Sequence, residues 1–170
     1  MIAFTKLFRS IPYKVFLYIY IINMSRIPHL YGATFAFILN KKGEILLQQR
    51  QNTWYYDGWR QVPSGHIDDG ETALQSIHHE CLEEININIT VNESNIFHII
   101  HRISTDRQYI DIWVKIDNRT GTIKNNEPEK CSALERFSFD NLPSYISPVT
   151  LRLIEAYQSK QFYSEIIEHL

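Results

Sequence analysis

Four glutamates stand at short spacing near the middle of the chain, at Glu71, Glu80, Glu83 and Glu84. On a helix Glu80 lies one turn before Glu83 and Glu84, so three carboxylates share one face. Their mutual repulsion requires a counter-ion, and hard carboxylate oxygens suit Mg²⁺. A carboxylate that binds no metal could take a proton from water. The spacing thus predicts a magnesium site, although a Glu-rich helical face can also be plain solvated surface.

A helix is the element that must position these carboxylates. From 71 to 85 apolar residues recur at three- and four-residue spacing, which predicts an amphipathic helix with one core-facing stripe. Asn86 is expected to end it, because asparagine tolerates the left-handed backbone conformation that closes many helices. The stripe consists of Ala73, Leu74, Ile77, Cys81 and Ile85. We therefore expect the carboxylates to face away from the core.

Strands are expected on both sides of this helix. Before it, β-branched and aromatic residues predict strands at 31–39 and 44–50, joined as a hairpin, and a short strand at 59–62 followed by a loop. After it, we expect strands at 87–91, 96–103, 110–116 and 134–137, a loop at 118–128, and a helix from the Ser147 cap to about 158. This order predicts an α+β fold with helices packed on a mixed sheet.

Together with the loop before it, the glutamate helix resembles the Nudix signature. That signature reads Gly, five residues, Glu, seven residues, then Arg-Glu-apolar-x-Glu-Glu-x-Gly-apolar, and it forms a loop, a helix and a loop. The resemblance to MutT-like bacterial members extends through 46–50, 59–66, 126–131 and 142–143, and so covers about 30–158. The signature positions matched in register are Gly65, Glu71, Glu80, Cys81, Glu83, Glu84 and Ile87.

The resemblance implies a fold and a reaction. The fold would be the Nudix α/β/α sandwich around a mixed β-sheet, and the reaction would be attack of water on a nucleoside diphosphate linked to another group. A nucleoside triphosphate, cleaved to the monophosphate and pyrophosphate, leads among small-molecule nucleotide substrates, with ADP-ribose-type nucleotide sugars behind it. The other open interpretation is a Nudix-like module that binds a nucleotide with weak or no turnover.

The resemblance also assigns roles to the carboxylates. Glu80 and Glu84 would bind Mg²⁺, or Mn²⁺ in its place, with help from the Gly65 carbonyl. Glu83 would be a further ligand or the general base, so that Glu83 and Glu80 are the catalytic candidates. Glu127 lies in a later loop where some family members supply an extra metal-binding carboxylate.

Three residues before the helix are candidates for substrate binding. Arg50 stands where MutT-type enzymes have an arginine that contacts phosphate or sugar, and its guanidinium could stabilise developing negative charge. Trp54 and Tyr55 could stack on a base, although aromatic residues beside a loop are as often packing. Arg50 could equally be a surface residue.

Two residues depart from the signature, and Glu71, His79 and Asn86 are assigned structural roles within it. Asn86 replaces the glycine and should cost little, since asparagine tolerates the left-handed conformation. His79 replaces the arginine, which in the family resemblance helps to orient a catalytic glutamate. A largely neutral imidazole supplies neither a fixed charge nor a bidentate fork, so we expect weakened activity.

Composition limits the class of partner and the compartment. The formal net charge of −2 gives no basic surface for nucleic acid. Cys81 and Cys131 are far apart and form no CxxC pair, which suits a reducing interior and predicts a cytoplasmic protein. His79-Glu80 lacks the second histidine of HExxH, so a zinc protease is excluded.

The chain divides into three expected parts. Residues 1–29 are taken as an extension of uncertain role whose apolar run, 15–22, is too short to span a bilayer, which needs roughly 20 residues. A dispensable extension, a helix packed on the domain or a partner, and a targeting segment all remain open for it. Residues 30–158 form the Nudix domain and 159–170 a C-terminal tail. A homodimer is compatible with the family, in which many small members pair.

Overall fold

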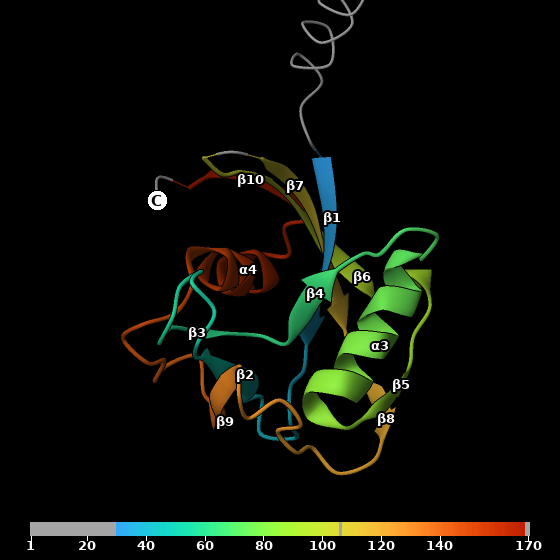
Figure 1. Ribbon diagram of the computed structural model, residues 1–170, viewed down its shortest axis with the longest axis vertical. Helices are drawn as coiled ribbons and strands as arrows, with labels where there is room; N and C mark the ends of the chain where they lie inside the picture. Colours follow the sequence, from blue (N-terminus) through green and yellow to red (C-terminus); the bar gives the residue numbers. More distant parts are fainter. Residues whose placement is uncertain (1–29, 106, 169–170) are drawn as a thin grey trace, which may run out of the picture.

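The computed structural model describes residues 30–168 except 106, so the expectations for 1–29 lie outside the described residues. The described elements follow the order that the sequence predicts in outline, with strands, a helix, further strands and a second helix (Figure 1). The strands are β1 Leu30–Phe37, β2 Ile45–Arg50, β3 Arg60–Gln61, β4 Ser64–His66, β5 Asn88–Thr90, β6 Ile96–Ile103, β7 Gln108–Lys115, β8 Asn118–Thr120, β9 Cys131–Phe137 and β10 Tyr163–Ile167. The helices are α3 Ala73–Ile85, the short 3₁₀ helix η2 Glu93–Asn95 and α4 Pro148–Ser159.

The largest sheet is mixed and has the strand order β10-β6-β7-β1-β4. Strand β1 pairs parallel with β7 and antiparallel with β4, while β6 pairs antiparallel with β7 and parallel with β10. The expected mixed sheet is therefore confirmed. The pairing of β1 with β4 places Thr34 opposite Gly65, which brings the loop before α3 onto the sheet.

The predicted hairpin of 31–39 and 44–50 is only partly correct. The chain does reverse at 40–43, where the Gly43 amide donates to the Asn40 carbonyl and Leu39 bridges to Ile45. Both edges of β1 are occupied by β7 and β4, however, so β2 lies in a separate sheet of order β3-β2-β9. Partner strands far along the chain decided this pairing.

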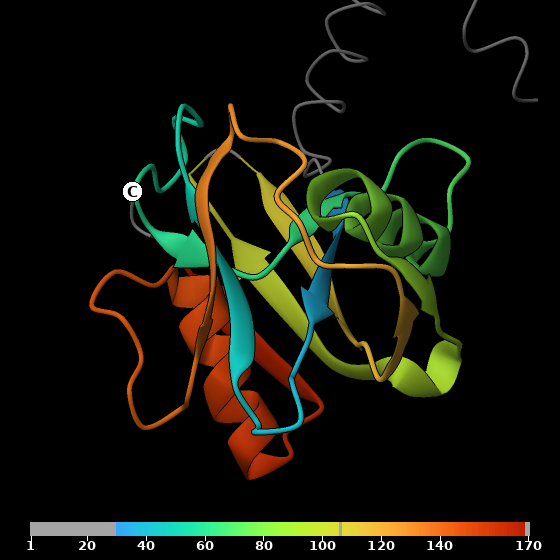
Figure 2. The same ribbon diagram turned by 90° about the horizontal axis from the view of Figure 1, so that it is seen from below.

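Two apolar layers lie on opposite faces of the sheets, and each is covered by one helix. Figures 1 and 2 show α4 and α3 on opposite sides of β1. Strand β2 supplies both layers, with Ile45 and Leu47 in the layer under α4 and Leu46 in the layer under α3. The fold is therefore the α/β/α sandwich expected from the sequence.

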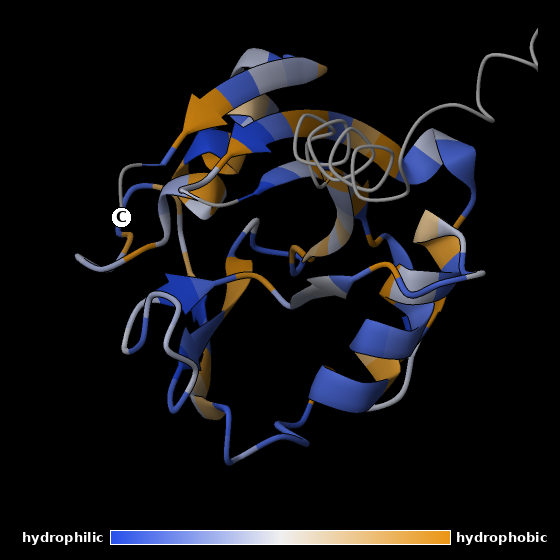
Figure 3. Cartoon of the chain, turned by 45° about the horizontal axis from the view of Figure 1, so that its top comes forward, coloured by the Kyte–Doolittle hydropathy of each residue, from blue (hydrophilic) through white to orange (hydrophobic). Residues whose placement is uncertain are grey.

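The signature helix α3 begins and ends at residues that satisfy its terminal backbone groups. Thr72 and Gln75 form a capping box, in which the Thr72 side chain accepts from the Gln75 amide and the Gln75 side chain accepts from the Thr72 amide. Asn86 closes the helix with φ 60° and ψ 38°, which confirms the left-handed conformation expected of it. In Figure 3 the helix is largely hydrophilic with hydrophobic positions at intervals, as an amphipathic helix requires.

Three short strands were not predicted. Residues 64–66 and 118–120 were expected as loop, yet they form β4 and β8, which pair with β1 and β5. The stretch after 158 was expected to be a tail, yet Tyr163–Ile167 form β10 at the edge of the large sheet. Each is five residues or fewer, and its strand conformation depends on a neighbour rather than on its own pattern.

No helix in the described part of the chain has the length and apolar character needed to cross a membrane.

Candidate active site

One cavity of about 480 Å³ opens where the two larger sheets meet the loop of residues 51–59 and the exposed face of α3. This volume is typical of a site for a small molecule. The residues expected from the sequence to bind metal or substrate all line it, whereas Glu71, His79 and Asn86 do not. The lining members are Arg50, Trp54, Tyr55, Gly65, Glu80, Glu83, Glu84 and Glu127.

Gly65 and Glu80 meet in direct contact at the centre of this cavity. A Cβ atom added to Gly65 would lie 1.7 Å from the Glu80 carboxylate oxygen Oε1 and 2.0 Å from its Cδ. No side chain fits in that space, since real Cβ atoms do not approach other atoms below 3.0 Å. The signature therefore requires glycine here for close approach of backbone to carboxylate.

Glu84 is the most firmly held of the acidic side chains. Its Oε2 accepts from the Ser64 amide at 2.9 Å and its Oε1 accepts from the Gln48 side chain at 3.3 Å. Burial, followed by the neighbouring Glu80 charge, raises the pKa of Glu84 to about 8, although these two hydrogen bonds oppose the shift. The carboxylate is thus oriented in a place where a negative charge lacks compensation.

Glu80 experiences the same kind of environment. Burial first, and then the charges of Glu83 and Glu127, raise the pKa of Glu80 to about 7. Lys130 lowers this pKa but does not cancel the repulsion. Glu83 is exposed at the rim, and no hydrogen bond or ion pair of its side chain is found among the described residues.

The later acidic residue, Glu127, comes to the cluster on a loop that is tied to α3. The Asn126 amide donates to the Glu84 carbonyl at 3.0 Å, and the Glu127 amide donates to the Asn125 side chain at 3.1 Å. Lys130 donates to Glu127 Oε1 at 2.6 Å. The loop therefore brings one more carboxylate and one cation to the cavity.

The donor set fits a divalent cation, although the side chains do not form a tight preformed cage. Among residues 30–168 without 106, no three His, Cys, Asp or Glu side chains converge closely enough to make a complete metal site. The carboxylates are nevertheless hard oxygen donors on one cavity wall, and the raised pKa values of Glu80 and Glu84 indicate missing positive charge. Mg²⁺, which keeps several waters and shares its ligands with phosphates, is compatible with so open an arrangement.

Arg50 faces this cluster from the end of β2. Its Nε donates to the Tyr55 carbonyl at 2.8 Å and to Thr53 Oγ1 at 3.1 Å, so the loop fixes one side of the guanidinium. Burial lowers the pKa of Arg50, and the charge of Glu84 opposes that shift. No hydrogen bond of its two Nη groups is found in the described part of the chain, which leaves them available at the cavity.

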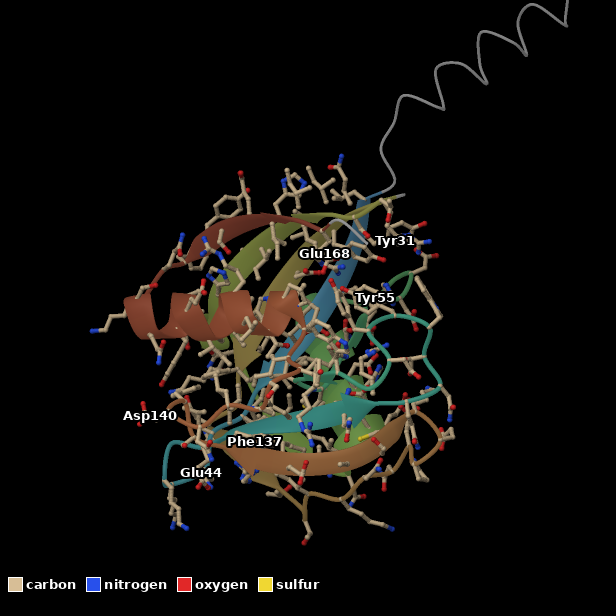
Figure 4. All side chains as sticks on the ribbon, turned by 90° about the vertical axis from the view of Figure 1, so that its left-hand side faces the viewer. Tyr31, Glu44, Tyr55, Phe137, Asp140 and Glu168 are labelled. Carbon is tan, nitrogen blue, oxygen red and sulfur yellow. The ribbon has the colours of Figure 1, made fainter. Side chains whose placement is uncertain are left out.

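The two aromatic candidates on the loop behave differently. Trp54 is 87% exposed and lines the cavity. Tyr55 is half-buried, and its hydroxyl donates to Glu168 Oε1 at 2.9 Å at the end of β10 (Figure 4). Burial first, and also the carboxylate of Glu168, raise the pKa of Tyr55. Tyr55 is therefore a fixed part of the wall, and Trp54 is a largely exposed ring that contacts Tyr55 at 6.0 Å between ring centroids.

The two departures from the signature have different surroundings. His79 Nδ1 lies 2.5 Å from Glu71 Oε1, on the outer side of α3, and Glu71 also accepts from the Asp68 amide at 3.3 Å. His79 thus contacts the first glutamate of the signature and none of the cavity carboxylates. The Asn86 side chain donates to the Thr122 carbonyl at 3.2 Å, which adds a tether to the next loop.

Several lining residues were not predicted from the sequence. Gln48 and Ser64 orient Glu84, and Lys130 pairs with Glu127. Arg102 and Tyr109 form the far wall, with the Arg102 guanidinium 3.8 Å from the centre of the Tyr109 ring. A sequence signal existed only for Lys130, which stands three residues after Glu127; the others are brought in by strand register.

Comparison with known proteins agrees with this geometry. The family model of the NUDIX domain matches residues 29–158. Among solved structures, a MutT NUDIX hydrolase from Burkholderia pseudomallei has a TM-score of 0.69 at 22% identity, covering 75% of this chain and 97% of that one. The E. coli ORF135 protein has a TM-score of 0.66 at 24% identity, covering 78% and 91%.

A third similar structure, the MutT protein from Methanosarcina mazei, has a TM-score of 0.62 at 20% identity and covers 77% of this chain and 97% of that one. At these identities the three structures establish the fold, and the family model establishes membership. The chain therefore belongs to the NUDIX family and is a Nudix hydrolase.

Proposed function

We propose that the chain hydrolyses a nucleoside diphosphate linked to another group, in the first place a nucleoside triphosphate to the monophosphate and pyrophosphate. The observation that carries this proposal is that the acidic side chains of α3 and the guanidinium of Arg50 line the same cavity, with Arg50 close enough to Glu84 for their charges to interact. A diphosphate between them would meet metal-binding carboxylates on one side and a hydrogen-bond donor on the other. The size of the cavity supports a small-molecule substrate.

The proposed metal ligands are the carboxylates of Glu80 and Glu84 and the carbonyl of Gly65, with Glu127 as a further donor. A bound Mg²⁺, or Mn²⁺ in its place, would supply positive charge to the diphosphate oxygens. Gln48 and Ser64 hold Glu84 in one orientation, so this ligand needs little reorganisation when a cation binds. The close contact of Gly65 with Glu80 supports a shared task for these two residues.

Glu83 is proposed as the general base, with Glu80 as the alternative. Glu83 makes no hydrogen bond or ion pair to another described side chain, so its carboxylate is free to accept a proton from water at the cavity rim. Glu80 has a pKa of about 7, near the value that suits a base at neutral pH, but it is also a proposed ligand.

Arg50 is proposed to bind the phosphate groups and to stabilise the negative charge that develops on them. Its Nε is already bound by the Tyr55 carbonyl, which orients the remaining donors. Trp54 is proposed as a stacking face for the base, because its ring is largely exposed and lines the cavity. Tyr55 would form part of the cavity wall beside the substrate rather than stack on the base.

A second candidate function is nucleotide binding with weak or no turnover. One observation favours it: His79 stands in place of the signature arginine and contacts Glu71, so it orients none of the cavity carboxylates. The clustered like charges of the cavity oppose it, because a binding module has no need of them. ADP-ribose-type nucleotide sugars remain the alternative substrate class.

A panel assay distinguishes these functions. The purified chain is incubated with Mg²⁺ and with nucleoside triphosphates, oxidised nucleoside triphosphates and ADP-ribose, and products are separated by anion-exchange chromatography. We expect monophosphate and pyrophosphate from a triphosphate, with loss of product in Glu83→Gln. Tight nucleotide binding by calorimetry without any product would favour the binding module.

We further propose a cytoplasmic location and a domain that covers at least 30–158. The buried free thiols of Cys81 and Cys131 support a reducing compartment. We also propose that residues 1–29 are dispensable for the domain and that the chain forms a homodimer. Sedimentation of the full chain and of a variant that begins at Met24 tests both points.

A further inference from the structure

The last described strand brings a carboxylate behind the cavity wall, where it contacts the lining residues Tyr55 and Arg102. Strand β10 follows the residues matched by the family model, and it pairs parallel with β6, with Ile167 opposite Ile103. At its end the Glu168 amide donates to the Ile103 carbonyl at 2.8 Å, and the Glu168 residue is only 6% exposed. The backbone thus delivers this side chain to a buried position.

The Glu168 carboxylate has two partners there. The Tyr55 hydroxyl donates to it at 2.9 and 3.2 Å, and Arg102 Nη1 donates to it at 3.1 Å. In Figure 4 Tyr55 and Glu168 lie side by side where the loop meets the end of β10. A segment near the C-terminus therefore contacts a loop more than a hundred residues earlier in the chain.

Neutralising Arg102 does not require Glu168. Arg102 already donates from Nε and Nη2 to the two carboxylate oxygens of Asp111, at 2.7 and 3.1 Å. This bidentate pair balances one cation with one anion. Glu168 is a second buried carboxylate beside it, and among the described residues it is the group to which the Tyr55 hydroxyl donates, while the same hydroxyl accepts from Arg102 Nη1 at 3.3 Å.

Strand β10 is also held in place without this carboxylate. The buried His98 ring, on β6, binds the Gln161 carbonyl through Nδ1 at 2.7 Å and Ser164 Oγ through Nε2 at 2.9 Å. The Ile99 amide donates to the Phe162 carbonyl at 2.9 Å. Replacing the Glu168 carboxylate therefore tests its contacts with the loop rather than the presence of the strand.

The contact continues from Tyr55 to the proposed phosphate-binding group. The Tyr55 carbonyl accepts from Arg50 Nε at 2.8 Å, and the Tyr55 ring lies 5.5 Å from the Arg50 guanidinium carbon. The loop that follows Arg50 includes two non-glycine residues with positive φ, Asn52 at 56° and Tyr56 at 46°. Such a backbone persists only where surrounding contacts hold it, and the Tyr55 hydroxyl is one of these contacts.

We propose that Glu168 is a positioning residue of the active site: by holding Tyr55 it fixes the Tyr55 carbonyl, and thereby the guanidinium of Arg50, toward the cavity. This proposal rests on the role of Arg50 in the proposed function. It adds the C-terminal strand, which lies beyond the family match, to the parts of the molecule on which the reaction depends.

The kinetic test compares Glu168, which directly follows β10, with Glu165 within that strand. Glu168→Gln keeps the shape of the side chain and removes its charge, and Glu165→Gln is the matched control, since Glu165 is exposed and contacts Tyr163. For the triphosphate hydrolysed fastest, Glu168→Gln should lower kcat/KM by about one to two orders of magnitude. The split between kcat and KM should match that of Arg50→Ala, and Glu165→Gln should equal the wild type.

A double-variant comparison separates positioning from general damage. In an Arg50→Ala background, Glu168→Gln should cause no further loss, because the group through which it acts is gone. Independent losses that multiply would overturn the proposal. Tyr55→Phe provides a second route if Glu168→Gln does not fold, with Tyr163→Phe as its control, because each variant removes one hydroxyl bound to a glutamate in or directly after β10.

Hydrogen exchange gives a readout that does not depend on activity. The amides of Arg50, Gly58 and Trp59 are bonded within the loop and its base. In Glu168→Gln or Tyr55→Phe they should exchange faster than in either control variant. Unchanged exchange would overturn the proposal even if the enzyme is active. Faster exchange in a chain that hydrolyses no nucleotide would refute the proposed function while upholding the control of the loop by Glu168.

Discussion

At the scale of single residues, Gly65 shows how a residue without a side chain determines the shape of an active site. The space that its Cβ would fill contains the carboxylate of Glu80. Burial first, and then the charges of Glu83 and Glu127, raise the pKa of Glu80, so this carboxylate lies in a confined acidic environment. Backbone and carboxylate therefore share one small volume of the cavity.

A methyl group at this position should disrupt the site. Gly65→Ala is expected to displace Glu80 and to lower kcat/KM by about a hundredfold, since misplacement by about 1 Å has effects of this size. Steady-state kinetics on the preferred nucleotide measures it. Gly32→Ala is the control, because the atom nearest its Cβ is the tip of the Ile67 side chain, at 2.8 Å, which can turn aside. Equal losses in both variants would contradict the role given to Gly65.

His79 is the residue at which the chain departs most from its family. Its imidazole contacts Glu71 through one nitrogen, whereas an arginine could bind the same carboxylate through two. We expect His79→Arg to raise kcat by about tenfold or more, because the loss of one orienting group typically costs at least that much. His78→Arg, one position away on α3, should have no effect. A lower or unchanged rate for His79→Arg would show that the histidine is not a defect.

The raised pKa values of the acidic cluster predict how pH and metal act together. The pKa values of Glu80 and Glu84, about 7 and about 8, lie above the ordinary 4.5 of a glutamate. At a pH between 4.5 and these raised values, the metal-free folded protein therefore binds more protons than the unfolded chain. Its stability should therefore fall as pH rises from about 4.5 to 8. Mg²⁺ competes with these protons and should bind more tightly, and stabilise more, at higher pH.

Thermal unfolding with and without Mg²⁺ across this range measures the effect. The gain in Tm caused by Mg²⁺ should grow with pH in the wild type and should be much smaller in Glu84→Gln. A gain that is constant with pH would argue against these carboxylates as the site of metal binding.

At the scale of elements, α3 and α4 end in the same way with different residues. Asn86 and Lys160 both adopt the left-handed conformation, with φ values of 60° and 56°. Asparagine visits this region readily, whereas lysine has no side-chain group to compensate the steric cost. The left-handed residue that ends α3 therefore has a lower steric cost than the one that ends α4, although α3 lacks the glycine of the family signature.

Glycine substitutions at these two positions test that comparison. Asn86→Gly should change the free energy of unfolding by no more than a few tenths of a kcal/mol, and Lys160→Gly should stabilise by about 1 kcal/mol. Urea unfolding followed by circular dichroism measures both. A large gain from Asn86→Gly would mean that the asparagine is a costly replacement.

The same elements show what sequence reasoning can reach. The helix of 71–85 and the strand Ile96–Ile103 were predicted closely, because each is long enough for its apolar period to be distinct. Strands β4, β8 and β10 were missed, since each consists of a few residues whose conformation is set by the strand beside it. The hairpin was wrong for the related reason that β1 has two other partners.

The candidate site follows the same division. The glutamates could be placed together from helical spacing, and the resemblance to the Nudix signature and to MutT-like members added Gly65 and Arg50. The groups that orient them could not be predicted. Gln48 and Ser64 reach Glu84 across 36 and 20 residues, and Glu168 reaches Tyr55 across 113 residues. Such contacts depend on strand register, which a single sequence does not state.

At the scale of the whole molecule, the sandwich separates stability from chemistry. Its two apolar layers lie under α3 and α4, and the cavity opens where the sheets diverge and the loops meet. The chain is nearly neutral, with a net charge of −2, yet the cavity is lined by several carboxylates together with Arg50, Arg102 and Arg107. Binding of an anionic nucleotide therefore depends on local charge and on a cation, rather than on the overall field.

The central claim is that the carboxylates of α3 and a divalent cation together cleave a diphosphate. The most direct measurement is the rate of pyrophosphate release from the preferred triphosphate, with Mg²⁺ or with chelator, for the wild type, Glu84→Gln and Glu93→Gln. Glu93 lies in η2 and does not line the cavity, so its variant is the matched control. The account predicts Mg²⁺-dependent release by the wild type and Glu93→Gln, and a loss of about a hundredfold or more in Glu84→Gln. Release that persists in chelator, or that Glu84→Gln leaves intact, would contradict it.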